Sequence, residues 1–286
     1  FLGAGGTEAR PIARDRFAWM RLDWEKFSLQ LGQDWDVVSP IKPTPNQPAD
    51  MGYAGNTGDR RPQLKAEFRQ KAGSGTLSLQ GSLGLTGSSD QEDLDGDGYR
   101  DGETSGRPNF QLRAAYSHSL WLKDKPATLG FGVITSRLRT VNPVFGRTVL
   151  HPRLLAADWI LPLAPKLDLR GEFWEGRHVS DFRGGILQGI NGVTGREVRA
   201  RGGWSELQLT PTKYFSLLGG YTTDDPVDGD LPNGARIRNG ARYVGSRINV
   251  SNSFQIGIDY LRWLTDYKNQ RRASDNRLAL FFQYSF

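Results

Sequence analysis

The sequence predicts an all-β protein: one transmembrane antiparallel β-barrel that occupies residues 1–286. Strand-length segments alternate apolar and polar side chains, as in a wall with one face on lipid and one on water. Short and long connections between these segments also alternate along the chain. Finally, the chain ends in SDNRLALFFQYSF, where Leu278, Leu280, Phe282, Tyr284 and Phe286 share one face and only Phe281 breaks the pattern. A soluble all-β protein would also alternate, but would seldom end on so many aromatic residues.

The composition permits this fold and excludes several other classes of protein. The chain contains no cysteine, which excludes disulfides, thiolate metal sites and a cysteine nucleophile. The mean hydropathy of -0.53 is low, but only alternate residues of a spanning strand face lipid. No run of about eighteen apolar residues occurs, which excludes a transmembrane helix. A net charge of +6 with scattered arginines argues against nucleic acid and favours acidic lipid or an anionic solute as partner.

Thirteen strands follow one another along the chain. They are the segments 14–24, 27–35, 63–70, 76–85, 109–121, 127–139, 154–163, 166–177, 199–210, 214–223, 239–250, 254–267 and 274–286. The alternation is clearest in 63–70, where Leu64 and Phe68 lie opposite Lys65 and Glu67. A polar second face of this kind distinguishes a water-filled lumen from a packed core.

The later strands form hairpins around the short turns KDKP, AP, PTK and SNS. Breaks in the alternation at Gly202-Gly203 and near Val244 predict β-bulges. Bacterial single-chain barrels have an even number of strands, with turns at the periplasmic side and loops outside. If the closing strand runs towards the periplasm, an upward strand must precede the first one visible. We therefore expect about 13 strands of a 16-stranded barrel, or alternatively of a 14-stranded one, with N-terminal strands and a signal peptide missing.

The segment 36–62 is the first long connection, and four prolines in PIKPTPNQP exclude a central strand there. Loops of this length in a compact domain are usually functional or disordered. We expect it to be an inward-folded loop that constricts the channel; the alternative is an ordinary extracellular loop.

The segment 86–108 is predicted to be an acidic extracellular loop, and its DLDGDGYRDGE motif resembles part of a calcium-binding loop. Alternating carboxylates followed by a glycine turn can wrap a hard cation. The candidate ligands are Asp93, Asp95, Asp97, Tyr99, Asp101 and Glu103. The twelfth position is Thr104 rather than glutamate, so a solvated loop tip without metal is the alternative. A bound calcium would be structural, since transport needs no cofactor.

Charged side chains on the polar faces are expected to line the lumen. The basic candidates are Arg21, Lys65, Arg69, Arg113 and Arg170, with Arg60 and Arg61 entering from the long loop. The acidic candidates facing them are Asp23, Asp34, Glu67, Asp168 and Glu172. Opposed ladders would create a transverse field, and an excess of arginine would favour anions. Alternatively, these charges merely pair with one another and contribute little.

Outward aromatic side chains near strand ends are expected to form two interfacial belts. They are Trp24, Phe27, Phe110, Trp121, Trp159, Phe173, Phe215, Tyr260 and Phe286.

Several short motifs resemble the DcaP-type trimeric outer-membrane porin family. FLGAGGTEARP is similar to a strand end and loop of that family, and Arg16 to Trp19 to the strand after it. LGQDWDVVSP resembles its Gly-Gln-x-Trp strand end, which a proline-rich loop and an Arg-x-Pro-Gln strand start follow, here Arg61-Pro62-Gln63. The resemblance implies a sixteen-stranded homotrimer that passes small, often anionic solutes. The acidic loop departs from the pattern, and the N-terminal coiled coil of some members is not visible.

The predicted function is therefore that of a porin in the bacterial outer membrane, in contact with the bilayer and lipopolysaccharide and permeable to small hydrophilic, anionic solutes. A structural or adhesive barrel with a plugged lumen is one alternative, and a barrel hydrolase another. Catalysis has little support, because His118, His151 and His178 are far apart in the sequence and no nucleophile motif occurs.

Overall fold

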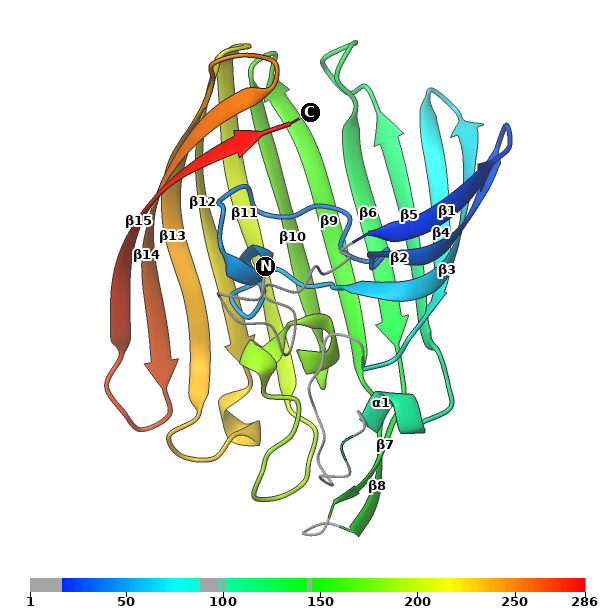
Figure 1. The fold of residues 1–286 in the computed structure, drawn as a ribbon, viewed down its shortest axis with the longest axis vertical. Coiled ribbons are helices and arrows are strands. Elements are labelled where there is room, and N and C mark those ends of the chain that lie inside the picture. The colour runs from blue at the N-terminus through cyan, green and yellow to red at the C-terminus, as the bar shows by residue number, and fades with distance from the viewer. Residues whose placement is uncertain (1–16, 88–97, 99–100, 143–145, 286) are drawn as a thin grey trace, which may run out of the picture.

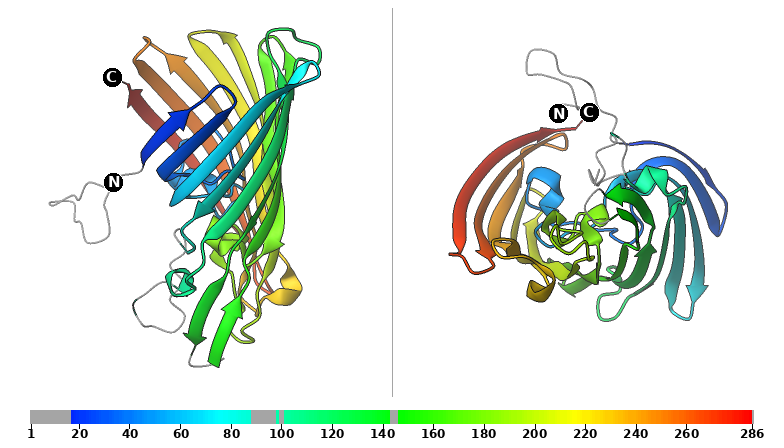
Figure 2. Two further views of the ribbon diagram at one scale, coloured as in Figure 1. Left: turned by 90° about the vertical axis from the view of Figure 1, so that its right-hand side faces the viewer. Right: turned by 90° about the horizontal axis from the view of Figure 1, so that it is seen from below.

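All thirteen predicted strands are present in the computed structural model, joined edge to edge in one antiparallel sheet (Figure 1). The structure describes residues 17–87, 98, 101–142 and 146–285. The strands are hydrogen-bonded in chain order from β1 to β15, apart from the separate hairpin β7-β8. The sheet curves into an incomplete ring, and β1 and β15 are its two unpaired edges (Figure 2). The all-β prediction and the number of visible strands are thus confirmed.

The first strands of the sheet are β1 (Ala18–Asp23), β2 (Phe27–Trp35), β3 (Arg60–Ala72), β4 (Gly75–Gly84), β5 (Asn109–His118) and β6 (Ala127–Thr135). They are followed by β9 (Arg153–Ala164), β10 (Leu167–Arg177), β11 (Arg199–Thr212), β12 (Phe215–Pro226), β13 (Arg236–Asn249), β14 (Phe254–Tyr267) and β15 (Ala273–Tyr284). The helical turns are short: η1 (Pro48–Met51), α1 (Asp101–Thr104), η2 (Val179–Phe182), η3 (Gly185–Leu187) and η4 (Asp228–Asp230). Among the residues described, no helix is long and apolar enough to cross a membrane.

Turns lie at one end of the sheet and long loops at the other, as the sequence predicts (Figure 1). One loop differs from the prediction, which continued a strand to residue 139. The strand β6 ends at Thr135, and the loop after it forms its own hairpin from β7 (Leu138–Asn142) and β8 (Gly146–Leu150). The Ser136 amide donates to the Pro152 carbonyl at 2.9 Å, which closes the base of this hairpin and separates it from β6.

The two faces of the sheet differ in chemistry. The convex face carries apolar side chains that remain open, such as Leu31 (57% exposed), Phe131 (68%) and Leu278 (76%). On the concave face, their neighbours in sequence include the buried Gln30. A convex face with so many exposed apolar side chains is rare on proteins in water, whereas a membrane-spanning strand needs apolar side chains on its lipid side. The alternation seen in the sequence therefore places the polar face inside the ring.

The β-bulges predicted at Gly202-Gly203 and Val244 are not observed. Pairing between β10, β11 and β12 runs through both glycines without a shift, and β13 pairs continuously through Val244. The glycine at 202 has a packing role instead, because a Cβ there would lie 2.4 Å from the ring of Trp174. The apolar–polar alternation is interrupted only in the sequence, because Gly202 makes room for Trp174, which points inward from the neighbouring strand.

Phe281 belongs to the concave face, which explains why it interrupts the apolar set of the closing strand. It pairs with Gly257 of β14, where a Cβ would lie 2.1 Å from its ring. The guanidinium of Arg247 lies 4.8 Å from the ring centroid. Phe281 is therefore an aromatic side chain of the lumen.

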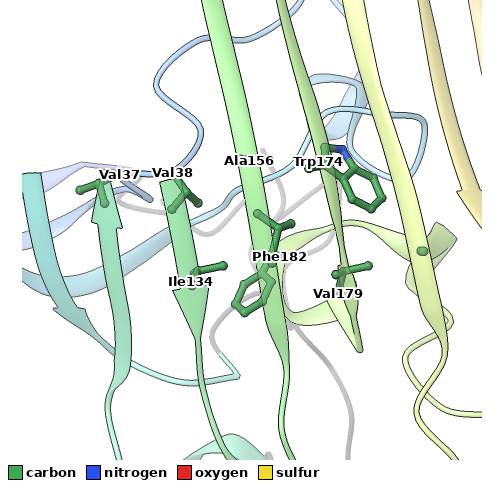
Figure 3. Close-up of a cluster of buried hydrophobic side chains, with 9 residues drawn as sticks. Val37, Val38, Ile134, Ala156, Trp174, Val179 and Phe182 are labelled. Carbon is green, nitrogen blue, oxygen red and sulfur yellow. The ribbon is translucent and has the colours of Figure 1, made fainter. Parts of the chain in front are cut away.

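Two of the long loops fold back onto the concave face. We call residues 36–59 the inner loop and residues 178–198 the second inner loop. Val37 and Val38 of the inner loop pack with Trp174 and with Val179 and Phe182 of η2 in a buried apolar cluster (Figure 3). A second cluster joins the inner loop to the opposite part of the wall, through contacts among Met51, Leu218, Ala241, Tyr243 and Leu261. The inner loop thus spans the concave side from β5 to β14.

Candidate functional site: the lumen and its inner loop

The carboxylate of Glu172 holds both ends of the inner loop against β10. It accepts hydrogen bonds from the hydroxyls of Ser39 at 2.7 Å and Thr57 at 2.6 Å. Glu172 is only 1% exposed, so the loop that it binds covers its carboxyl group. The sequence predicts Glu172 as an inward acid, and the structure gives it an anchoring role.

Two further carboxylates hold the middle of the inner loop. Glu206 of β11 accepts from the Thr44 amide at 3.0 Å and from the Thr44 hydroxyl at 2.5 Å. The same carboxylate accepts from the Tyr243 hydroxyl at 3.0 Å. Asp259 of β14 accepts from the Asn46 amide at 3.0 Å. Because hydrogen bonds to ionised acceptors are stronger than neutral ones, these contacts fix the loop at two points of the far wall.

The side chain of Arg247 strengthens the second of these points. Its guanidinium contacts the Asp259 carboxylate at 2.6 Å and 3.2 Å, and also donates to the Thr44 carbonyl at 2.8 Å. A lumen arginine therefore ties the loop backbone to a wall carboxylate.

Arg61 joins the two inner loops at the base of β3 and does not line the lumen as predicted. Its side chain is 0% exposed and contacts the carboxylates of Asp36 at 2.7 Å and Asp181 at 3.7 Å. It also donates to the carbonyls of Leu85 and Asp181, both at 2.9 Å. Removal of either partner of such a buried pair leaves an uncompensated charge, so Arg61 has a structural role.

Arg60 is the second correction to the predicted pore lining. Both Arg60 and Arg61 begin β3, whereas the sequence places them in the long loop. Arg60 pairs across the sheet with Trp35, and its guanidinium lies 4.8 Å from the Trp35 ring centroid. Because neighbouring residues of a strand point to opposite faces, Arg60 lies on the convex side.

The other charged residues predicted from the first strands do lie on the concave face, where they pair with one another. Arg21 contacts Glu67 at 3.7 Å, and Arg69 contacts the same carboxylate at 2.6 Å. Lys65 forms an ion pair with Asp34. Arg21 also reaches the carboxylate of Asp23, at 2.8 Å.

The remaining predicted residues lie on the middle strands. Arg113 forms a two-pronged ion pair with Asp158, at 2.8 and 2.7 Å, and both side chains are buried. Arg170 donates to the Lys42 carbonyl of the inner loop at 3.1 Å. Asp168 contacts Lys125 at 3.3 Å. The predicted opposition of separate basic and acidic ladders is therefore replaced by local pairs.

Burial divides the charged side chains of the concave face into covered and exposed ones. The anchoring acids Glu172, Glu206 and Asp259 are at most 1% exposed. By contrast, the side chain of Arg69 is 55% exposed and that of Arg21 25% exposed. Solvent therefore meets these basic groups and also Asp23, whose side chain is 62% exposed, while the inner loop covers the three anchoring acids.

The sequence analysis missed several anchoring residues. Arg247 and Tyr243 lie beside Val244, and Glu206 follows Gly202-Gly203, where the suspected bulges made the faces unsafe to assign. Asp259 lies on β14, whose pairing with β13 depends on the same assignment. If inward and outward side chains alternate strictly through Gly202-Gly203 and Val244, the concave face receives all four anchoring side chains: Glu206, Tyr243, Arg247 and Asp259.

The predicted calcium site cannot be placed, since Asp93, Asp95, Asp97 and Tyr99 lie outside the described residues. Asp101 begins α1 and is buried, and nothing is described of the Glu103 side chain. Within the described ranges, no cluster of three or more potential metal ligands occurs. Calcium binding in the loop therefore stays a prediction.

Comparison with known proteins places the fold. No protein-family model and no curated protein matches the chain. The crystal structure of the outer membrane channel DcaP of Acinetobacter baumannii superposes with a TM-score of 0.70 at 13% identity, over 90% of this chain and 71% of that chain.

Two other solved structures superpose less well. The CymD monoaromatic hydrocarbon channel gives a TM-score of 0.40 at 11% identity, over 94% of this chain and 81% of that one. The siderophore receptor PirA of A. baumannii gives 0.42 at 13% identity, over 92% and 46%. Only the similarity to DcaP carries an inference: the chain has the fold of an outer-membrane channel.

Proposed function

We propose that the protein is a porin of the bacterial outer membrane that allows passive diffusion of small hydrophilic, anionic solutes. The observation that carries this proposal is the inner loop. It is held across a polar concave face by the hydrogen bonds that it donates to the carboxylates of Glu172, Glu206 and Asp259. A loop that is fixed within a ring of strands narrows the passage, and this constriction involves no chemical reaction. Diffusion through such a passage needs only water, a constriction and a field.

The location follows from the same geometry. An apolar convex face suits lipid, and short turns opposite long loops are typical of barrels in the outer membrane. The similarity in fold to an outer-membrane channel supports the same location. Assembly as a homotrimer remains a proposal that rests on the family resemblance of the sequence.

Anion preference is proposed from the exposed arginines of the lumen. Exposed arginines such as Arg69 raise the local concentration of anions, and low-dielectric walls strengthen their field. The inner loop covers three acids that would oppose this field, Glu172, Glu206 and Asp259, whereas Asp23 is open to solvent. We therefore expect anionic solutes to pass faster than cations of the same size.

Swelling of proteoliposomes tests the proposal directly. Vesicles that contain the purified protein should swell in neutral sugars of low mass, and faster with a small carboxylate than with an amine of equal size. Vesicles without protein are the control. Equal rates in both kinds of vesicle would contradict a channel, and faster entry of the amine would contradict anion preference alone.

A plugged structural barrel is the second candidate, and the two inner loops favour it. Their shared apolar cluster with Trp174 and Phe182 is buried, so part of the concave side is filled by protein. If the two inner loops fill the whole cross-section of the barrel, vesicles will not swell with any solute, even though the protein is folded and inserted.

A further inference from the structure

Two arginines on the convex face have no ion-pair partner within the part of the chain that the structure describes. Arg242 of β13 and Arg262 of β14 are directly opposite each other in the sheet. Both are exposed, and among the described residues neither takes part in an ion pair. Like charges in directly opposite positions destabilise a sheet. A bound anion would relieve this repulsion.

Their face is fixed by their neighbours. Tyr243, next to Arg242, is buried among the side chains that hold the inner loop on the concave side. Leu261, next to Arg262, belongs to the same buried cluster. Since successive side chains alternate between faces, both arginines point outward, to the lipid side of a spanning wall.

The height of the pair places it near one edge of the apolar band. Eight residues separate Phe254, at the turn end of β14, from Arg262. At about 3.4 Å per residue and a tilt of about 40°, this distance corresponds to roughly 20 Å of height. The apolar band of such barrels is about 25 Å tall, so the arginines lie close to the interface on the loop side. Phosphates of the outer leaflet lie at that level.

Nearby acids are already neutralised by other arginines. Asp225 is shared between Arg201 at 3.2 Å and Arg238 at 3.1 Å. Asp266, opposite Arg238 in the sheet, forms an ion pair with Arg272. This row of paired charges lies four residues nearer the loops than Arg242 along β13, and its described carboxylates are already paired.

A groove of about 890 Å³ continues the basic surface from Arg238 towards β9. Three of its arginines are cross-strand neighbours in one row, since Arg177 pairs with both Arg153 and Arg199. Arg177 and Arg199 contact Glu197 and Asp230, respectively. Glu175 and Asp228 also line the groove, so acids balance its arginines and the unbalanced basic charge of this surface lies at Arg242 and Arg262.

We propose that Arg242 and Arg262 bind the phosphate groups of a phosphorylated glycolipid in the outer leaflet. Guanidinium groups match phosphate oxygens in geometry as well as charge. The proposal rests on the proposed location in the outer membrane and is independent of solute passage. The ligand is a lipid rather than a soluble phosphate, because the arginines lie among side chains that face the bilayer.

The test compares binding of lipid A, a phosphorylated disaccharide lipid, to the purified protein and to the double variant Arg242→Gln/Arg262→Gln by native mass spectrometry. Loss of two basic residues at about 1 kcal/mol each predicts about thirtyfold weaker binding. The variant Lys26→Gln/Lys213→Gln removes the same charge at the turn end and should bind like the wild type. Wild-type protein should lose binding when the lipid is dephosphorylated.

Equal retention of lipid A by the wild type and the Arg242/Arg262 variant would overturn the inference. A variant that instead changes the number of protein copies per complex, with lipid binding unaltered, would assign the pair to a contact between copies and also overturn it. The charge-retaining variant Arg242→Lys/Arg262→Lys should keep at least part of the affinity, which controls for misfolding. Vesicle swelling should be equal in all variants, so failure of the lipid site is distinguishable from failure of the channel.

Discussion

Substitution of Glu206 by alanine should release the middle of the inner loop from the wall. Glu206 accepts two hydrogen bonds from Thr44, and hydrogen bonds to charged acceptors contribute about 1.5 to 3 kcal/mol each. Loss of both removes at least about 3 kcal/mol from the docked state of this segment. At 1.36 kcal/mol per factor of ten, local opening becomes more frequent by at least about a hundredfold.

Hydrogen exchange followed by mass spectrometry measures this opening at the Thr44 amide. In Glu206→Ala, that amide should exchange at least about a hundredfold faster, and single-channel conductance should become larger or noisier. Glu67→Ala is the matched control, because Glu67 pairs with Arg69 on the same face and does not contact the inner loop. Unchanged exchange at Thr44 would refute the anchoring role of Glu206, and faster exchange with unchanged conductance would refute the role of the loop as a constriction.

Three further predictions concern the rest of the wall and its loops. Trp174→Ala should lower the free energy of unfolding in lipid vesicles by about 3 to 5 kcal/mol, because it empties a fully buried site; Phe173→Ala, on the convex face, should cost less in the same urea titration. Asp158→Ala should cost about 3 to 5 kcal/mol by leaving Arg113 buried and unpaired, and joint replacement of both by apolar residues should restore most of it. If the loop 93–103 binds calcium, chelation should speed its proteolysis, whereas equal rates with and without chelator would contradict a calcium site.

Much of the wall could be predicted because a spanning strand repeats one simple requirement. Each strand alternates between lipid and water, so segments such as 63–70 show their two faces in the sequence alone. The alternation of turns and loops then fixes the antiparallel order. Local chemistry is sufficient for this level of structure.

The arrangement of the lumen was harder to predict, because it depends on contacts between residues far apart in the chain. Nothing in the sequence near Glu206 indicates that Thr44, from a loop that six strands of the sheet separate from β11, will lie against it. Likewise, the sequence shows Arg61 only as one of two adjacent arginines. Its structural role depends on Asp36 and Asp181, which contact it in the folded protein. The glycine at 202 was misinterpreted as a bulge, since its partner Trp174 lies on another strand.

The central claim is that the inner loop narrows an open aqueous passage. Single-channel recording in planar bilayers tests this claim most directly, with a salt gradient across the membrane to report selectivity. We predict stable open steps with a reversal potential of the sign for anions, and a larger conductance when Glu206→Ala loosens the loop. Folded, inserted protein that shows no steps, with or without this substitution, would contradict the account.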